Sequence, residues 1–209
     1  MISVCLADSL PVVHYGVKSY FKDHPGINIT SQIGSFLMVQ DALKNKIVDV
    51  LIIDLELYGL NSIYELKAII KSFPNTKVLV FTNLNEQIYS SNAIKAGACG
   101  YIHKSSKLEA LELMILKVSQ GIVTMSETVL RNLALIAKQN KTGQLHRKLS
   151  NREVEVLRFL SDGKKNNEIS KILGLNEKTI STYKLRLLQK LNVSNVVDLV
   201  NKAKNLAIV

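Results

Sequence analysis

Short apolar runs alternate with amphipathic segments over the first 120 residues, and this alternation restricts the possible folds more than any other feature. The apolar runs are Ile2–Ala7, Ile27–Ile33, Val48–Ile53, Val78–Thr82 and Tyr101–His103. Nearly continuous apolar runs rich in β-branched residues are typical of parallel strands that are buried on both faces. Between the runs, apolar residues such as Leu111 and Ile115 recur with the helical period. Five such strand–helix units predict an α/β fold with a doubly wound, five-stranded parallel sheet.

Four chemically reactive side chains stand at the predicted strand ends: Asp8, Asp54, Thr82 and Lys104. In an open parallel sheet, groups at the carboxyl ends of the strands converge on one crevice. A carboxylate that attacks a phosphoryl group needs a nearby cation, because like charges repel. A lysine and a hydroxyl can then bind the phosphoryl oxygens. The set predicts a site that accepts a phosphoryl group, although any single one of these acids would more simply cap a turn.

The net charge of +10 is distributed unevenly along a chain of 209 residues, which is the length of two ordinary domains. Residues 1–125 carry 11 lysines against 10 acidic residues, a net charge of +1. Residues 126–209 carry 16 lysines and arginines against 7 acidic residues, a net charge of +9. A basic second half indicates a polyanionic partner, of which nucleic acid is the commonest. A basic surface that only keeps the protein dissolved is the alternative that charge alone leaves open.

Residues 147–209 contain four helical patterns and no pattern typical of a strand. The first helix starts with a capping box at Ser150–Glu153, and the second spans about Asn166–Leu173. The third runs from its cap Asn176 to about Leu191, and the fourth spans about Ser194–Asn205. Two helices joined by a tight turn that contains glycine form a helix-turn-helix. The predicted organisation is a domain at 1–121, a connector at 122–146 and a small all-α helix-turn-helix domain at 147–209. Within the connector, Ser126 is predicted to cap a short helix.

The third of these helices divides into an apolar and a polar face. The apolar face contains Ile180, Leu187, Leu188 and Leu191. The predicted base contacts are Ser181, Thr182 and Leu185, near the helix N-terminus, where major-groove readers place them. The predicted phosphate contacts are Lys178, Lys184, Arg186 and Lys190, which add affinity without sequence information. A solvated basic helix face is the simpler alternative.

These motifs resemble those of a known protein family. Residues 1–121 resemble the receiver domains of two-component response regulators, which have a flavodoxin-like fold. The segments LSNREVEVL, NNEISKILGL and TISTYKLRLLQKLNV resemble the LuxR-type helix-turn-helix. The domain order is similar to that of NarL/FixJ response regulators. The resemblance implies a cytoplasmic transcription regulator that is controlled by a sensor histidine kinase and binds double-stranded DNA as a homodimer.

The resemblance also implies roles for individual residues. Asp54 is implied as the phosphoacceptor, Thr82 as the switch hydroxyl and Lys104 as the phosphate-binding lysine. Tyr101 is similar to the rotating aromatic residue that reports phosphorylation to the receiver surface. Packing at the end of a strand is the simpler role for Tyr101.

A Mg²⁺ cofactor is implied as well, with Asp8, Asp54 and the backbone carbonyl of Glu56 as ligands. The family usually has two adjacent acids after the first strand, whereas Asp8 is followed by Ser9 in this chain. A neutral hydroxyl is a weaker ligand for a hard cation than a carboxylate. We therefore predict weak Mg²⁺ binding and inefficient phosphorylation of Asp54. The same departure raises the alternative of a degenerate receiver, in which partner binding, a ligand or constitutive dimerisation controls the regulator.

Other functional classes fit the sequence less well. A phosphatase or hydrolase with Asp54 as nucleophile would need a second catalytic acid, and Glu56 is a poor substitute, so a turnover enzyme is not predicted. No apolar stretch is long enough to cross a membrane. Cys5 and Cys99 lie in apolar segments and are predicted to be free thiols in a reducing cytosol. The apolar residues within Val196–Ala203 are predicted either to form a dimer contact or to close the domain core.

Overall fold

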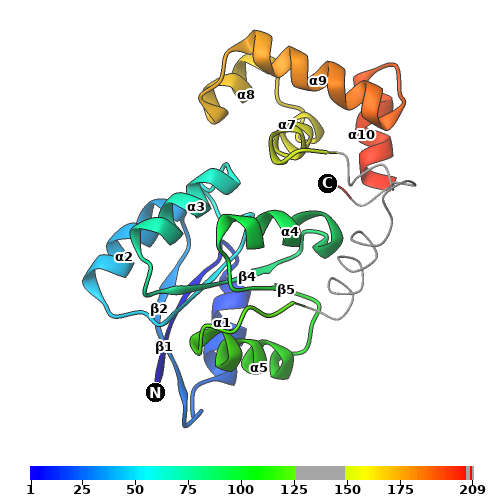
Figure 1. Cartoon of the computed structure of the whole chain (residues 1–209). Helices are drawn as coiled ribbons and strands as arrows, with labels where there is room; N and C mark the ends of the chain where they lie inside the picture. Colours follow the sequence, from blue (N-terminus) through cyan, green and yellow to red (C-terminus); the bar gives the residue numbers. More distant parts are fainter. Residues whose placement is uncertain (126–148, 206–207, 209) are drawn as a thin grey trace. The chain divides into compact units, whose positions relative to one another are not determined.

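The computed structural model describes residues 1–125, 149–205 and 208 of the chain. The chain forms two compact units, Met1–Leu130 and Arg131–Val209 (Figure 1). The predicted connector helix that Ser126 would cap, and most of the predicted connector, lie outside the described residues.

The first unit is built around five parallel strands in the order β2-β1-β3-β4-β5. The strands are β1 (Ile2–Ala7), β2 (Ile27–Ile33), β3 (Val50–Ile53), β4 (Lys77–Thr82) and β5 (Gly100–His103). The prediction of a five-stranded parallel sheet is confirmed. Strand β3 was predicted to begin at Val48 but begins at Val50, because its pairing with β1 starts only there. Val48 is apolar because it is buried, although it lies ahead of the strand.

Helices cover both faces of this sheet (Figure 1). They are α1 (Pro11–Tyr20), the 3-10 turn η1 (Phe36–Met38), α2 (Val39–Asn45), α3 (Ile63–Ser72), α4 (Glu86–Ala96) and α5 (Leu108–Ser119). Alternate residues of β3 enter two separate cores. Val50 and Ile52 pack with residues of α1 and α5, whereas Leu51 and Ile53 pack with residues of α2, α3 and α4. Burial on both faces explains why β1, β3 and β4 are almost continuously apolar in sequence, whereas the edge strand β2 includes polar residues and is only partly buried.

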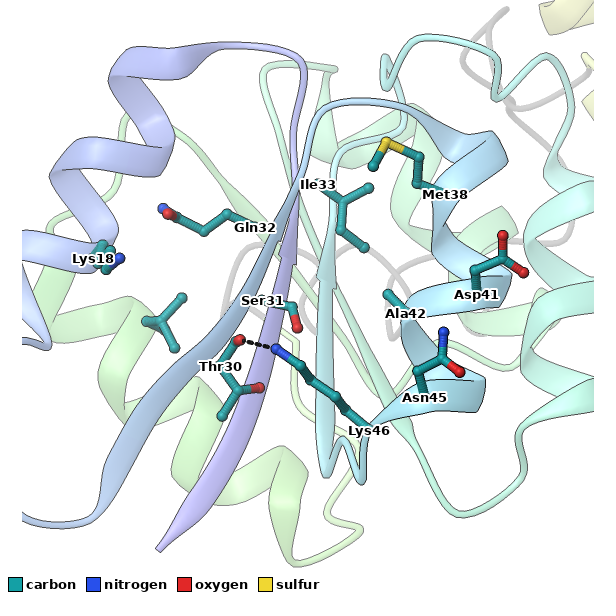
Figure 2. A pocket seen from close by; sticks show the side chains of 11 residues that line it. Lys18, Thr30, Ser31, Gln32, Ile33, Met38, Asp41, Ala42, Asn45 and Lys46 are labelled. Atoms are coloured by element: carbon teal, nitrogen blue, oxygen red, sulfur yellow. Dashed lines mark hydrogen bonds between the residues drawn. The ribbon is translucent and has the colours of Figure 1, made fainter.

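The two edges of the sheet are protected in different ways. At the β5 edge the chain returns, and Gly100 forms a parallel bridge with Thr124. At the β2 edge, a register shift interrupts the pairing with β1, and the Lys46 ammonium donates a hydrogen bond of 2.9 Å to the Thr30 carbonyl (Figure 2). This edge borders an open groove of about 550 Å³. A lysine and an irregular strand are features that discourage pairing of the β2 edge with another chain.

The second unit is helical throughout residues 149–205, the range in which the structure describes it. Its helices are α7 (Asn151–Ser161), α8 (Asn166–Leu173), α9 (Glu177–Leu191) and α10 (Val196–Asn205). A capping box between Ser150 and Glu153 starts α7. Gly174 ends α8 with a φ of +63°, a left-handed conformation that glycine adopts without strain. The four predicted helices are confirmed, with α8 and α9 forming the helix-turn-helix.

Helix α10 completes the core of this second unit. Leu199 and Ala203 are fully buried, whereas Val197 is 69% exposed. The apolar face of the last helix therefore serves mainly to close the domain core, and Val197 remains at the surface. In the part of the chain that the structure describes, no helix is both long enough and apolar enough to span a membrane.

Candidate functional site

The carboxyl edge of the sheet brings two acids together. Asp8 directly follows β1 and Asp54 directly follows β3, and Ala7 pairs with Ile53 at the ends of these neighbouring strands. The Asp54 N–H donates a hydrogen bond of 3.0 Å to the Ala7 carbonyl. Asp8 is 1% exposed and Asp54 is 4% exposed. Two carboxylates are thus buried side by side, which requires a compensating charge.

Lys104, which directly follows β5, supplies that charge. Its Nζ lies 2.5 Å from Asp54 Oδ2 and 2.6 Å from Asp8 Oδ2, and its side chain is 7% exposed. Burial lowers the pKa of Lys104, but hydrogen bonds to Asp54 and Asp8 and the charges of both acids outweigh burial and raise the pKa. The ammonium therefore stays charged and holds the two acids together.

Backbone amides hold the remaining carboxylate oxygens. The Leu10 N–H donates to Asp8 Oδ1 at 2.8 Å, and the Glu56 N–H donates to Asp54 Oδ1 at 3.0 Å. Each acid is thereby fixed by a local turn, while its Oδ2 contacts Lys104. One lysine therefore serves two aspartates, which leaves an excess of acidic side chains at this edge.

Mg²⁺ would find the carboxylates of Asp8 and Asp54 at this edge, and the Glu56 carbonyl stays a predicted third ligand. Among the described residues, no group of three or more His, Cys, Asp and Glu side chains could hold a metal ion. Ser9 uses its hydroxyl oxygen to accept a hydrogen bond of 2.7 Å from the Tyr58 N–H. Mg²⁺ is commonly held by one or two carboxylates together with several waters. Asp8 and Asp54 therefore fit the ion, although they offer it little negative charge from the protein.

Thr82 and Tyr101 meet at the loop that follows β4. Both side chains are fully buried. Thr82 Oγ1 accepts a hydrogen bond of 3.4 Å from the Leu84 N–H, and the Tyr101 hydroxyl donates one of 2.9 Å to the Leu84 carbonyl. Burial, followed by the charges of neighbouring acidic groups, raises the pKa of Tyr101, so its hydroxyl remains a donor. The two predicted switch residues are therefore joined through the backbone of Leu84.

A second side chain of β5 holds the same loop, and no sequence pattern predicts this contact. His103 Nε2 lies 2.9 Å from the Asn83 carbonyl, and His103 Nδ1 accepts a hydrogen bond of 3.1 Å from the Ser105 N–H. Because Nδ1 accepts, the ring proton lies on Nε2 and is donated to Asn83. Tyr101 and His103, two residues apart on one strand, thus bind consecutive carbonyls of the loop after Thr82.

Helix α9 presents the predicted DNA-contacting residues at its surface. Lys178, Thr182, Leu185 and Arg186 are exposed, and Ser181, Lys184 and Lys190 are partly buried. Ile180, Leu187 and Leu191 are fully buried on the apolar face, with Leu188 partly buried. Leu185 is 59% exposed, so it does not serve the core. An exposed leucine among cationic side chains suits apolar contact with a base edge.

The hydroxyl protons of Ser181 and Thr182 are used within the unit. Thr182 Oγ1 donates to the Lys178 carbonyl at 2.9 Å, and Ser181 Oγ donates to the Glu177 carbonyl at 3.1 Å. Ser181 Oγ also accepts a hydrogen bond of 3.1 Å from the Asn166 side-chain amide at the start of α8. Thr182 therefore presents its hydroxyl oxygen as an acceptor, whereas Ser181 also links the two helices of the helix-turn-helix.

Comparison with known proteins covers both units. Residues 4–116 match the response regulator receiver domain, and residues 147–203 match the LuxR family of bacterial regulatory proteins. The chain belongs to the response regulators.

Relatives of this response regulator align over nearly its whole length. The Fimbriae Z protein of Salmonella typhimurium is 31% identical over 204 residues, which cover 97% of this chain and 96% of that protein. Response regulator UvrY of Escherichia coli is 28% identical over 207 residues, which cover 97% of this chain and 94% of that protein. The structure of RcsB from Salmonella enterica serovar Typhimurium bound to promoter rprA in the presence of the phosphomimetic BeF3⁻ superposes with a TM-score of 0.78 at 28% identity, over 96% of this chain and 97% of that one. The resemblance to NarL/FixJ response regulators is confirmed.

In this response regulator, one of the lysines predicted to contact phosphate has a structural partner. Lys190 Nζ lies 2.7 Å from Glu153 Oε2, and the Glu153 side chain is 3% exposed. The Ser150 N–H donates to the same oxygen at 2.6 Å. Lys190 thus ties α9 to the start of α7 across 37 residues of sequence, a pairing that no local pattern reveals. Its contact with phosphate stays a prediction.

The Glu153–Lys190 pair predicts a specific pH dependence of stability. Burial raises the pKa of Glu153, but hydrogen bonds from Lys190 and Ser150 outweigh burial and lower the pKa below its ordinary value of 4.5. Because the pKa of Glu153 is lowered in the folded state, the pair contributes fully to the free energy of unfolding at pH values above the unfolded-state pKa. That contribution is lost as the pH falls through the folded-state pKa. We expect Glu153→Gln to cost about 2 kcal/mol at pH 7, because a charged hydrogen bond is lost, and to flatten the acid limb below pH 4.5.

The measurement is urea denaturation of the full chain at a series of pH values, following NMR signals of α7 and α9. Lys190→Met is the companion variant, since it removes the same pair from the other side. Parallel curves for wild type and Glu153→Gln through the acid range would contradict this assignment.

Proposed function

We propose that this response regulator binds promoter DNA as a homodimer in the cytoplasm, and that a sensor histidine kinase controls it by phosphorylating Asp54. The observation that carries the proposal is the contact of Lys104 Nζ with Asp54 Oδ2 and Asp8 Oδ2 at one buried sheet edge. This geometry offers an acid that can accept a phosphoryl group and an ammonium already within reach of it. The protein acts by binding and signalling, and catalytic turnover is no part of the proposal.

Phosphorylation of Asp54 changes the charge of the cluster. The acyl phosphate carries about −1.5 to −2 charges at neutral pH, in place of the single charge of the carboxylate, and it adds three acceptor oxygens. Lys104 lies beside Asp54 Oδ2 and pairs with these oxygens by a short movement. Asp8, Asp54 and the Glu56 carbonyl would hold Mg²⁺, whose positive charge reduces the repulsion between the acids and an incoming phosphoryl group.

The loop after β4 carries the signal from the acceptor to the surface. When the Thr82 hydroxyl turns toward the phosphoryl oxygens, it leaves the Leu84 N–H that it now accepts from at 3.4 Å. Leu84 is also the acceptor for the Tyr101 hydroxyl, so a movement of the loop changes the position of a buried aromatic ring. Two alternative arrangements of one packed loop are what a switch requires.

The dimer population follows from the same switch. If the arrangement with phosphorylated Asp54 favours one receiver surface, phosphorylation raises the fraction of dimer and thereby brings two reading helices to two half-sites. The relative RcsB is bound to promoter DNA in the presence of a phosphomimetic, which supports a link between the acceptor site and DNA binding in a chain of the same family.

Ser9 favours a second candidate, a DNA-binding regulator whose receiver works without efficient phosphorylation. The cluster has only two carboxylates, and the Ser9 hydroxyl oxygen is already used by the Tyr58 N–H at 2.7 Å. In this candidate, a partner, a ligand or constitutive dimerisation replaces the phosphoryl group as the control.

DNA binding by the full chain should be strongly dependent on salt, because lysine and arginine displace counterions from DNA phosphates. Thr182→Ala and Leu185→Ala should each cost about 1–3 kcal/mol on the preferred site and little on random DNA, since they remove base contacts. Lys184→Ala should weaken both kinds of DNA alike and lower the salt slope by roughly 1. Fluorescence anisotropy titrations at several salt concentrations measure these effects.

Lys22→Ala is the matched control, because it removes an exposed lysine from the first unit and should leave DNA affinity unchanged. Absence of DNA binding by the full chain at low salt, with and without a phosphodonor, would contradict the proposal. Equal losses on specific and random DNA for Leu185→Ala would remove Leu185 from the base contacts.

Phosphorylation should be slow and confined to Asp54. Incubation with a small phosphodonor and Mg²⁺ should add one phosphoryl mass to the wild type and none to Asp54→Asn. Ser9→Asp should tighten Mg²⁺ binding by about tenfold or more, because it adds a full charge beside the cation. Intact-mass spectrometry and metal titration are the measurements. Equal, tight Mg²⁺ affinity in wild type and Ser9→Asp would show that Ser9 is no handicap, and no binding in either would favour the second candidate.

A further inference from the structure

Ser9 joins two loops that are far apart in sequence. It stands in the loop between β1 and α1, and its Oγ accepts a hydrogen bond of 2.7 Å from the N–H of Tyr58, 49 residues away. Tyr58 lies in the loop between β3 and α3, which begins at Asp54. The residue beside Asp8 therefore contacts the loop that carries the acceptor by a direct hydrogen bond.

The geometry of that loop explains why Tyr58 has an amide to give. The Leu60 N–H donates to the Leu57 carbonyl at 2.9 Å, and Gly59 has a φ of +86°, the signature of a type II turn with Tyr58 at its second position. The N–H at the second position has no partner inside such a turn. Ser9 supplies the missing acceptor.

The carbonyl of Tyr58 is held from the other side. It accepts a hydrogen bond of 2.8 Å from the Phe36 N–H, in the loop between β2 and α2. One peptide segment is thus bound by the loops after β1 and β2 together, although the Tyr58 side chain is 73% exposed and contributes little packing. Backbone hydrogen bonds, and not burial of the ring, fix this turn.

The fixed turn continues directly from the acceptor. The Leu57 N–H donates to the Asp54 carbonyl at 3.2 Å, and the Glu56 N–H donates to Asp54 Oδ1 at 3.0 Å. The segment from Asp54 to Leu60 is therefore a chain of consecutive turns, anchored by β3 at one end and by Ser9 near the other. A displacement of Tyr58 would be passed to the amide that orients the Asp54 carboxylate.

We propose that Ser9 is a positioning residue for the acceptor loop, and that its hydroxyl holds the segment Asp54–Gly59 in place without the help of a cation. Asp8 and Asp54 each already accept a hydrogen bond from a backbone N–H of the turn that follows them. The Ser9 hydroxyl is therefore not needed to hold either acid and can bridge the two loops. A loop that is already in place need not be ordered when Asp54 is phosphorylated, which lowers the free-energy cost of that step. This gain offsets part of the disadvantage of weak cation binding by only two carboxylates. The inference rests on the proposed function, in that Asp54 is the acceptor.

Two substitutions remove this hydrogen bond from opposite sides. Ser9→Ala removes the acceptor, and Tyr58→Pro removes the donor while keeping a residue that type II turns favour at the second position. Ser9→Thr keeps the hydroxyl and Tyr58→Phe keeps the amide, so these are the matched controls. The double variant Ser9→Ala/Tyr58→Pro tests whether both act through one contact.

The first readout is NMR amide hydrogen exchange in the metal-free full chain, at the amides of Glu56 and Leu60. Exchange should accelerate about fivefold in Ser9→Ala and Tyr58→Pro, because one hydrogen bond is lost, and no further in the double variant. The two controls should match the wild type. Unchanged exchange in Ser9→Ala, or additive acceleration in the double variant, would overturn the inference.

The second readout is the rate of phosphoryl uptake from a small phosphodonor at fixed Mg²⁺, followed by intact mass. Ser9→Ala and Tyr58→Pro should be slower by about fivefold, with unchanged unfolding midpoints of the sheet. Faster amide exchange with an unchanged uptake rate would overturn the positioning role. A wild type that takes up no phosphoryl group contradicts the proposed function alone, because the exchange measurement in metal-free protein tests the hydrogen bond independently.

Discussion

The receiver depends on the Lys104 ammonium between two buried carboxylates. Asp8 and Asp54 come from neighbouring strands and are 1% and 4% exposed, so without Lys104 their charges would repel in a poorly solvated site. The contacts of 2.5 and 2.6 Å hold the ends of β1, β3 and β5 together. In the proposed function, a phosphoryl group on Asp54 would compete for this same ammonium, and one local charge would then change the balance of the whole edge.

In the proposed switch, backbone groups would pass on that change more than side-chain packing would. Tyr101 and His103 bind the carbonyls of Leu84 and Asn83, so β5 holds the loop after β4 at two consecutive points. Ser9 binds the amide of Tyr58 in the loop after β3. The central strands β1, β3 and β4 are mostly buried, and the loops at the carboxyl edge of the sheet carry the groups that the proposed switch uses. The site and the switch are therefore built from the same loops.

Sequence periodicity was sufficient to predict the sheet and the helices of the second unit. It was also sufficient to bring the four strand-end residues together, because the strand ends of a parallel sheet converge whatever the side chains are. It could not reveal contacts between loops. The Ser9–Tyr58, His103–Asn83 and Glu153–Lys190 contacts join residues that are 49, 20 and 37 positions apart, with no pattern in the intervening sequence. From the sequence alone, Ser9 is therefore seen only as the absence of an acidic residue that the family usually has at this position. In the structure it has a partner of its own.

The central claim is that the state of the Asp54 site sets the affinity for DNA. Its most direct test is the dissociation constant of the full chain for its preferred DNA site, measured with and without beryllofluoride as a phosphoryl mimic, in wild type and in Asp54→Asn. Beryllofluoride with Mg²⁺ should tighten DNA binding by the wild type and have no effect on Asp54→Asn. Equal affinity of the wild type in both conditions, with beryllofluoride bound, would contradict it.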